Sequence, residues 1–201
     1  MHGRSPPEPD LRMKAYLKLI VVLTLICLFW TALLAGVNAV TKDRIDEAAR
    51  QKEIKAARDV LPTDAPVPEL RGFGAVSNFV SIAENGNFVG AAVRGHSANG
   101  YGGNLVLMVG FTSAGDVFSF EVLETAETPG LGSKVNTPSF KDQFQGKPLS
   151  THWAVKKDGG DIDAITAATI SSRAALEAIR EAVTQFEIIR DSLRNGAPTL
   201  P

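Results

Sequence analysis

The segment Asn104-Leu-Val-Leu-Met-Val-Gly-Phe-Thr112 decides the fold of this 201-residue chain. In an extended segment, successive side chains point to opposite faces of a sheet. Val106 and Met108 therefore share one face. The opposite face carries a longer apolar row, made of Leu105, Leu107, Val109 and Phe111. Because both faces are apolar, we predict a central strand that is covered on both sides.

Segments before and after this strand also have the composition of strands. They are rich in β-branched and aromatic residues and cover residues 73–83, 87–94 and 117–124. Turn-forming sequences separate them: Glu84-Asn-Gly86, a glycine-rich loop before Asn104, and Ser113-Ala-Gly-Asp116. Short turns join neighbouring strands in opposite directions, so these segments predict an antiparallel sheet.

An amphipathic helix is predicted to follow the sheet, at residues 172–190. Apolar residues recur there every three or four positions, which gives a helix one apolar face. They are Ala174, Ala175, Ala178, Ile179, Ala182, Val183, Phe186 and Ile189. Strands followed by a packed helix are typical of an α+β domain rather than a doubly wound sheet. We therefore predict an α+β domain, with an antiparallel sheet packed with helices, over residues 70–190.

The N-terminal part of the chain is predicted to cross a membrane once. No charged residue lies between Lys18 and Lys42, and a helix rising ~1.5 Å per residue over that length crosses a hydrocarbon core of about 30 Å. A cleaved signal peptide is the alternative, because Val37-Asn-Ala39 resembles a small-residue cleavage site. The apolar stretch is longer than the core of a usual signal peptide, which favours an uncleaved transmembrane helix at residues 19–41.

Basic residues lie on both sides of this span, so their count does not decide its orientation. A large domain can be translocated largely regardless of its charge. We expect residues 1–18 to form a cytoplasmic tail and the C-terminal domain to lie on the periplasmic, or extracytoplasmic, side of the inner membrane.

Residues 42–69 are predicted to form a helical stalk and a linker. Thr41 can cap a polar helix from about Asp43 to Val60, whose apolar stripe is thin. The proline-rich residues 62–68 end this helix, because proline lacks an amide donor and forces its neighbour into an extended conformation. We expect the globular domain to begin near Leu70 and to be followed by a tail at residues 191–201.

Composition argues against several classes of function. A net charge of −1 gives no basic field, so nucleic acid is not an expected partner. The single cysteine, Cys27, lies within the apolar segment and provides neither a disulfide framework nor a thiolate cluster. His2, His96 and His152 lack the spacing of a metal site, and Ser171 lies in no Gly-x-Ser-x-Gly motif. Redox chemistry would therefore require a bound organic cofactor.

The sequence Asp163-Ala-Ile-Thr-Ala-Ala-Thr169 lies directly before the predicted C-terminal helix. The free amide groups and the dipole of a helix N-terminus attract phosphate, and the small side chain of Ala168 leaves room for a ligand. An ordinary helix cap by Ser171 or Ser172 is the alternative interpretation of these hydroxyl-rich residues. The residues alone leave both interpretations open.

This stretch resembles the flavinylation motif Asp-x-x-Ser/Thr-Gly-Ala-Thr of the FMN-binding domain family. In that family, the hydroxyl of the final Thr forms a phosphoester with FMN, which a dedicated flavin transferase installs from FAD. The resemblance implies covalent FMN on Thr169 and a contribution of Asp163, Thr166 and Ala168 to the site. Ala167 stands where the family has Gly, so this alanine is strained if the position has a positive φ.

Two upstream loops resemble other segments of the same family. Gly100-Tyr-Gly-Gly103 is similar to its GYGG segment, and Tyr101 is expected to pack on the sheet rather than against a flavin ring. Residues 127–132 are similar to its ETPGLG loop, in which Pro-Gly favours a tight turn and Leu131 can cover a ring. A plain surface turn is the alternative. The resemblance adds these residues to the expected FMN-binding site: Glu127, Thr128, Gly130, Leu131 and Gly132.

The resemblance implies a membrane-anchored electron-transfer subunit with covalently bound FMN. Such subunits work with other membrane subunits of Rnf-type complexes, which couple electron transfer between ferredoxin and NAD to ion translocation. We do not expect the isolated chain to be catalytic. The alternatives are a membrane-tethered module that binds or senses flavin reversibly, and an NqrC-like subunit of a sodium-translocating quinone reductase. An anchored scaffold without flavin would require both motif matches to be accidental.

Overall fold

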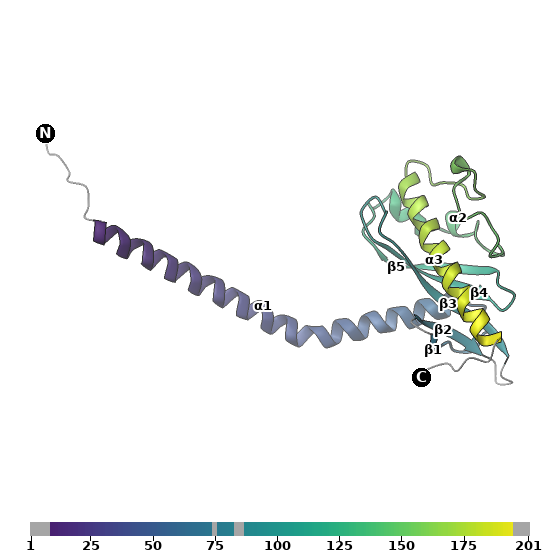
Figure 1. The fold of residues 1–201 in the computed structure, drawn as a ribbon, viewed down its shortest axis with the longest axis horizontal. Coiled ribbons are helices and arrows are strands. Elements are labelled where there is room, and N and C mark those ends of the chain that lie inside the picture. Colours follow the sequence, from purple (N-terminus) through teal and green to yellow (C-terminus); the bar gives the residue numbers. More distant parts are fainter. Residues whose placement is uncertain (1–8, 74–75, 83–86, 195–201) are drawn as a thin grey trace. The chain divides into compact units, whose positions relative to one another are not determined.

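The computed structural model describes residues 9–73, 76–82 and 87–194 (Figure 1). The predicted turn at residues 84–86 lies outside these ranges, as do His2 and part of each predicted tail. The chain divides into two compact units, Met1–Arg50 and Gln51–Pro201. The second unit contains the whole sheet and both of the later α-helices.

A single helix, α1 (Pro9–Asp59), includes both the predicted span and the predicted polar helix. Thr41 does not cap a second helix, because its hydroxyl donates a hydrogen bond to the carbonyl oxygen of Val37, one turn back, at 2.9 Å. No proline or glycine lies between Val37 and Leu61, so nothing in the sequence ends the helix there. Among the described residues, α1 provides the one candidate membrane span, and its most apolar window is fully exposed in the isolated chain.

Five antiparallel strands form the predicted sheet, in the order β1-β2-β3-β4-β5. Their bounds are Glu69–Phe73, Val76–Ile82, Phe88–Ser97, Leu105–Thr112 and Val117–Thr125. Strand β4 pairs with both β3 and β5, and every residue except its last is buried, as predicted for a central strand. Strand β1 was not predicted, because its sequence Glu-Leu-Arg-Gly-Phe has charges and a glycine and follows a proline-rich stretch.

Helix α3 (Thr169–Arg194) covers one face of the sheet and contacts β3 and β4 (Figure 1). The predicted row from Leu105 to Phe111 points into this layer. Phe111 stacks on Phe186 of α3, with 4.4 Å between the ring centroids. The predicted apolar face of the C-terminal helix is therefore the face that forms the larger core.

The end of α1 packs on the opposite face of the sheet. Its buried residues Ala56, Ala57 and Val60 belong to one apolar cluster with Val106 and Met108 of β4. Both faces of β4 are thus covered, each by a different helix. The last turns of the predicted stalk form a layer of the globular unit, because their thin apolar stripe meets the second face of the sheet.

The chain between β5 and α3 contains three short helices: η1 (Gly132–Asn136), α2 (Pro138–Lys141) and η2 (Lys156–Asp158). Aromatic side chains anchor this segment in the core, where Phe144 and Trp153 stack with 6.1 Å between their centroids. A parallel bridge joins Val155 to Ile162. The segment ends at Thr169, where α3 begins three residues before its predicted start.

Candidate functional site

Thr169 is the first residue of α3. The turn before it is closed by two bonds of Ser172: the hydroxyl oxygen accepts from the amide of Ile165 at 2.9 Å and donates to the carbonyl oxygen of Ala168 at 3.0 Å. The backbone amide of Ser172 also donates to Ala168, at 3.0 Å. Ser172 thus lies within the first turns and stabilises the preceding loop. The interpretation of Ser171 or Ser172 as an ordinary N-cap is therefore wrong.

Ala167 has a φ of 63° and is the one non-glycine residue with a positive φ in the described part of the chain. The left-handed conformation brings an L-residue's Cβ close to its carbonyl oxygen, which costs about 1–2 kcal/mol. The position therefore has the conformation that suits glycine, and the alanine is strained. This strain lies two residues before Thr169.

A cleft of about 500 Å³, which we call the Thr169 cleft, joins the start of α3 to the two upstream loops. Its lining residues are Tyr101, Glu127, Thr128, Leu131, Gly132, Ala167, Ala168, Thr169, Ile170 and Ser171. The volume lies within the range of about 300–1,000 Å³ that is usual for ligand sites. Three chain segments that are far apart in sequence, two loops and the start of α3, therefore meet in one concave site.

The rim of the Thr169 cleft is apolar and accessible. Tyr101, Leu131 and Ile170 are 70%, 43% and 47% exposed. The prediction that Tyr101 packs on the sheet is wrong, because its ring projects from the glycine-rich loop at this rim. Ile170 was not predicted as a site residue, although an apolar residue directly after the attachment position was the available signal. These side chains offer a flat ligand apolar contacts from several sides.

The loop at residues 127–132 contains the predicted tight turn. The amide of Leu131 donates to the carbonyl oxygen of Thr128 at 3.2 Å. Pro129 and Gly130 occupy the central positions, and the φ of Gly130 is 79°, which is typical of a type II turn. Gly130 itself does not line the cleft, and its amide donates to the hydroxyl of Ser133 at 2.9 Å. Its function is thus to shape the turn that presents Leu131.

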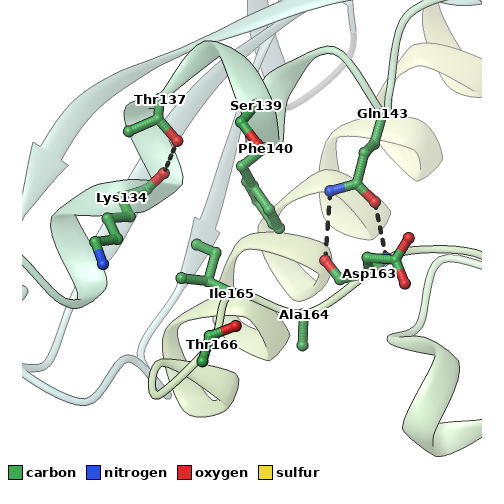
Figure 2. Close-up of a pocket in the computed structure, with 9 residues that line it drawn as sticks. All are labelled: Lys134, Thr137, Ser139, Phe140, Gln143, Asp163, Ala164, Ile165 and Thr166. Carbon is green, nitrogen blue, oxygen red and sulfur yellow. Dashed lines mark hydrogen bonds between the residues drawn. The ribbon is translucent and has the colours of Figure 1, made fainter.

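Two predicted residues lie in a different pocket, of about 460 Å³, which we call the Asp163 pocket (Figure 2). Its lining residues are Lys134, Thr137, Ser139, Phe140, Gln143, Asp163, Ala164, Ile165 and Thr166. The carboxylate of Asp163 pairs with Lys156 at 2.7 Å, and the backbone amide of Asp163 donates to Gln143 Oε1 at 2.8 Å. The structure thus divides the predicted site residues: Asp163 and Thr166 line this pocket, whereas Thr169 lines the cleft.

Ion pairs and hydrogen bonds fix a groove beside the cleft, which shares Ile170 with it. Hydrogen bonds from Arg173, at 2.7 and 2.8 Å, lower the pKa of Asp158 and tie η2 to α3. Hydrogen bonds from Ser97 and Asn99 lower the pKa of Glu177. These contacts hold the first three turns of α3 against neighbouring segments.

Residues 100–184 match the family model of the FMN-binding domain, and residues 13–60 match that of the RnfG N-terminal region. The first range includes all residues of the Thr169 cleft and of the Asp163 pocket. The fold and the site therefore define a class, that of proteins with an FMN-binding domain.

Two similar proteins narrow this class to one family. The G subunit of the ion-translocating oxidoreductase complex from Shewanella baltica is 32% identical, with 82% of this chain and 86% of that protein covered. The corresponding G subunit from Salmonella typhimurium is 37% identical, with 76% and 82% covered. The chain belongs to the family of these G subunits. With the candidate span in α1, this membership fits a single-pass inner-membrane protein.

A solved structure shares the fold. It is the C subunit of the Na(+)-translocating NADH-quinone reductase from Parabacteroides distasonis, with a TM-score of 0.54 and 16% identity. The match covers 75% of this chain and 96% of that one. The predicted fold class, an α+β domain that follows an N-terminal apolar helix, is confirmed.

Proposed function

We propose that the chain is the FMN-carrying electron-transfer subunit of an Rnf-type complex, which couples electron transfer between ferredoxin and NAD to ion translocation. The observation that carries this proposal is the position of Thr169, at the N-terminus of α3 and inside a ligand-sized cleft with an apolar rim. The match to the FMN-binding domain and the membership of the G-subunit family support it independently.

The cleft residues fit the two chemically different ends of FMN. The side chains of Tyr101, Leu131 and Ile170 suit a flat ring, whereas the Thr169 hydroxyl and the amides of the first helical turn suit a phosphate. When bound, FMN supplies reversible one- and two-electron chemistry. The chain itself contributes attachment, orientation of the ring and partial exclusion of water.

We further propose that the attachment is a phosphoester on Thr169 Oγ1. A flavin transferase would catalyse attack of this hydroxyl on the flavin-side phosphorus of FAD. A P–O bond to Thr169 forms, the pyrophosphate bond breaks, AMP leaves and the hydroxyl proton passes to a base or to solvent. No electrons are transferred in this step, which has FAD as its only co-substrate.

The topology that we propose keeps residues 1–18 in the cytoplasm and residues 19–41 in the inner membrane. Residues 42–69 would connect this span to the FMN-binding domain at residues 70–190, which a tail at residues 191–201 follows. We place the domain on the periplasmic, or extracytoplasmic, side. A covalent link suits that location, because FMN lost there could not be replaced easily. Other membrane subunits of the Rnf-type complex would be its electron-transfer partners.

Co-expression of the full chain with a flavin transferase tests the attachment site. After denaturing electrophoresis, the wild-type band is expected to fluoresce, whereas the Thr169→Ala band is expected to stay dark. Thr169→Ser keeps a hydroxyl and is expected to retain fluorescence. Thr184→Ala is the matched control, because it removes an exposed threonine hydroxyl from the same helix, outside both the cleft and the Asp163 pocket. Fluorescence of Thr169→Ala would exclude the proposed attachment residue.

Reversible binding of flavin by a membrane-tethered sensory module is the second candidate function. The observation that favours it is the strained φ of 63° at Ala167, close to the attachment residue. This candidate predicts a flavin that stays with the native chain but leaves on denaturation. The same electrophoresis distinguishes it, since a reversible ligand would leave every band dark.

A further inference from the structure

Glu127 is a buried carboxylate in the wall of the Thr169 cleft, with 7% of its surface exposed. Its Oε2 accepts a hydrogen bond from the hydroxyl of Ser171 at 2.7 Å. Its Oε1 accepts another from the backbone amide of Tyr101 at 2.8 Å. We call this pair of bonds the Glu127 bridge. It connects the three chain segments that form the cleft.

The surrounding backbone fits closely around this carboxylate. A Cβ atom on Gly132 would lie 2.1 Å from Oε2, and one on Gly100 would lie 2.6 Å from Oε1. Ser171 is itself 2% exposed. The absence of a Cβ at both glycines therefore leaves room for the Glu127 carboxylate. Since burial of a carboxylate is costly unless it is hydrogen-bonded, the bridge offsets the cost of placing Glu127 there.

Both carboxylate oxygens thus accept hydrogen bonds from the protein, in the wall of the cleft where Glu127 is expected to contribute to the cofactor site. One bonded group belongs to Tyr101, whose ring is exposed at the cleft rim, and the other to the buried Ser171, which directly follows Ile170 of that rim. The bridge consequently fixes the separation between the Tyr101 loop and the first turn of α3.

We propose that Glu127 is a positioning residue, whose bridge holds the Tyr101 loop and α3 at the separation that a flat flavin ring requires. The inference rests on the proposed function and deepens it. Attachment and ring binding then depend on different residues. Thr169 holds the phosphate. Glu127 keeps the Tyr101 loop and α3 at a fixed separation and does not touch the flavin.

The bridge can be tested in the full chain, purified in detergent after co-expression with a flavin transferase. Glu127→Ala removes the acceptor of the Tyr101 amide and of the buried Ser171 hydroxyl. Glu127→Gln is the conservative variant, because its amide oxygen can accept from Tyr101 and its amide nitrogen can donate to Ser171. Glu124→Ala is the matched control, because Glu124 is three positions away and exposed, with a 3.2 Å contact to Arg94.

Two measurements separate attachment from ring binding. Fluorescence after denaturation measures attached flavin, and the visible circular dichroism of the native protein measures ring binding. We expect Glu127→Ala to keep its attached flavin but to lower the ratio of bound to free ring about tenfold, which equals about 1.4 kcal/mol. Glu127→Gln and Glu124→Ala should resemble the wild type. Ser171→Ala leaves the Tyr101 bond in place and should give an intermediate signal. It replaces Glu127→Ala as the test variant if Glu127→Ala does not fold.

Wild-type circular dichroism in Glu127→Ala, or in Ser171→Ala if only that variant folds, would overturn the proposal. An equal loss in Glu127→Gln and Glu127→Ala would also overturn it, because hydrogen bonding would then not be the cause. If folded Glu127→Ala carries no attached flavin, Glu127 acts in attachment and the proposal is wrong.

Failure of the proposed function is distinguishable from failure of the bridge. If the wild-type chain acquires no covalent flavin, free FMN is titrated into the full chain and binding is followed by fluorescence quenching. About tenfold weaker binding by Glu127→Ala than by Glu127→Gln would support the bridge. Equal affinities, or no binding by the wild type, would overturn it.

Discussion

The Thr169 cleft and the Asp163 pocket differ in chemistry, although one short motif supplies residues to both. The cleft has an exposed apolar rim of Tyr101, Leu131 and Ile170. Of the apolar side chains of the pocket, Phe140 is buried and Ala164 and Ile165 are partly buried, and the lining also includes the polar side chains of Lys134, Gln143 and Asp163 (Figure 2). Neighbouring residues of one motif can therefore serve different surfaces. We infer that the Thr169 end of the motif holds the cofactor, and that the Asp163 end is available to the maturation enzyme.

The largest expected effect comes from placing a charge on the rim of the cleft. Ile170→Glu should lower the ratio of bound to free flavin ring about tenfold or more, because it replaces apolar contact area worth about 1.5–3 kcal/mol. Ile188→Glu is the matched control, since Ile188 is 46% exposed on the same helix and Ile170 is 47% exposed. Iodide quenching of native flavin fluorescence measures the difference. Equal quenching in both variants would show that the rim does not bind the ring.

The Asp163 pocket should affect maturation instead. Asp163→Ala removes the carboxylate that pairs with Lys156 at 2.7 Å, on a residue that lines the Asp163 pocket and not the Thr169 cleft. We expect flavin attachment to slow about tenfold, the effect of one lost charge-assisted contact of about 1.4 kcal/mol, while the spectrum of the attached flavin stays unchanged. Time courses with purified transferase and FAD measure the rate. An altered native spectrum at an unchanged rate would reverse the assignment of the two surfaces.

Backbone strain between the two surfaces should have a smaller effect. Ala167→Gly removes the Cβ penalty at a φ of 63° and should stabilise the chain by up to about 1 kcal/mol. Ala164→Gly is the control, because Ala164 has no positive φ and glycine there adds freedom to the unfolded chain, which should destabilise by about 0.4–1 kcal/mol. Urea unfolding followed by tryptophan fluorescence measures both. A destabilised Ala167→Gly would contradict the strain.

The smallest expected effect concerns pH. Hydrogen bonds from Ser97 and Asn99 lower the folded-state pKa of Glu177, so its contribution to stability is present above the unfolded pKa and is lost as pH falls through the folded pKa. Glu177→Gln should therefore be less stable than the wild type at neutral pH by less than about 1 kcal/mol. The difference should disappear in acid. Thermal unfolding of both proteins across this range checks the prediction, which a pH-independent difference would contradict.

Local sequence patterns predicted the sheet and the packed helix because their apolar periodicities are strong. The alternation from Leu105 to Phe111 gave both faces of β4, and the three-to-four spacing around Phe186 gave the face of α3. Strand β1 has no such pattern, so only pairing with β2 reveals it. The helix end at Ala56 to Val60 gave only a thin stripe, whose burial depends on a sheet far away in sequence.

The candidate site was predicted less completely, since it depends on contacts between distant segments. The motif resemblance pointed to Thr169 and to the loop at residues 127–132, and both line one cleft. It could not show that Asp163 lines another pocket, or that Tyr101 is exposed. The bond between Glu127 and Ser171 spans 44 positions of sequence, and no local pattern announces it.

The covalent flavin on Thr169 is tested most directly by peptide mass spectrometry of the full chain, after co-expression with a flavin transferase and protease digestion. We predict that the mass of an FMN phosphoester, FMN less one water, is found on the peptide that contains Thr169. Fragmentation should place it on that residue rather than on Thr166. An unmodified Thr169 peptide from protein that binds flavin in its native state, or a modification on another residue, would contradict the account.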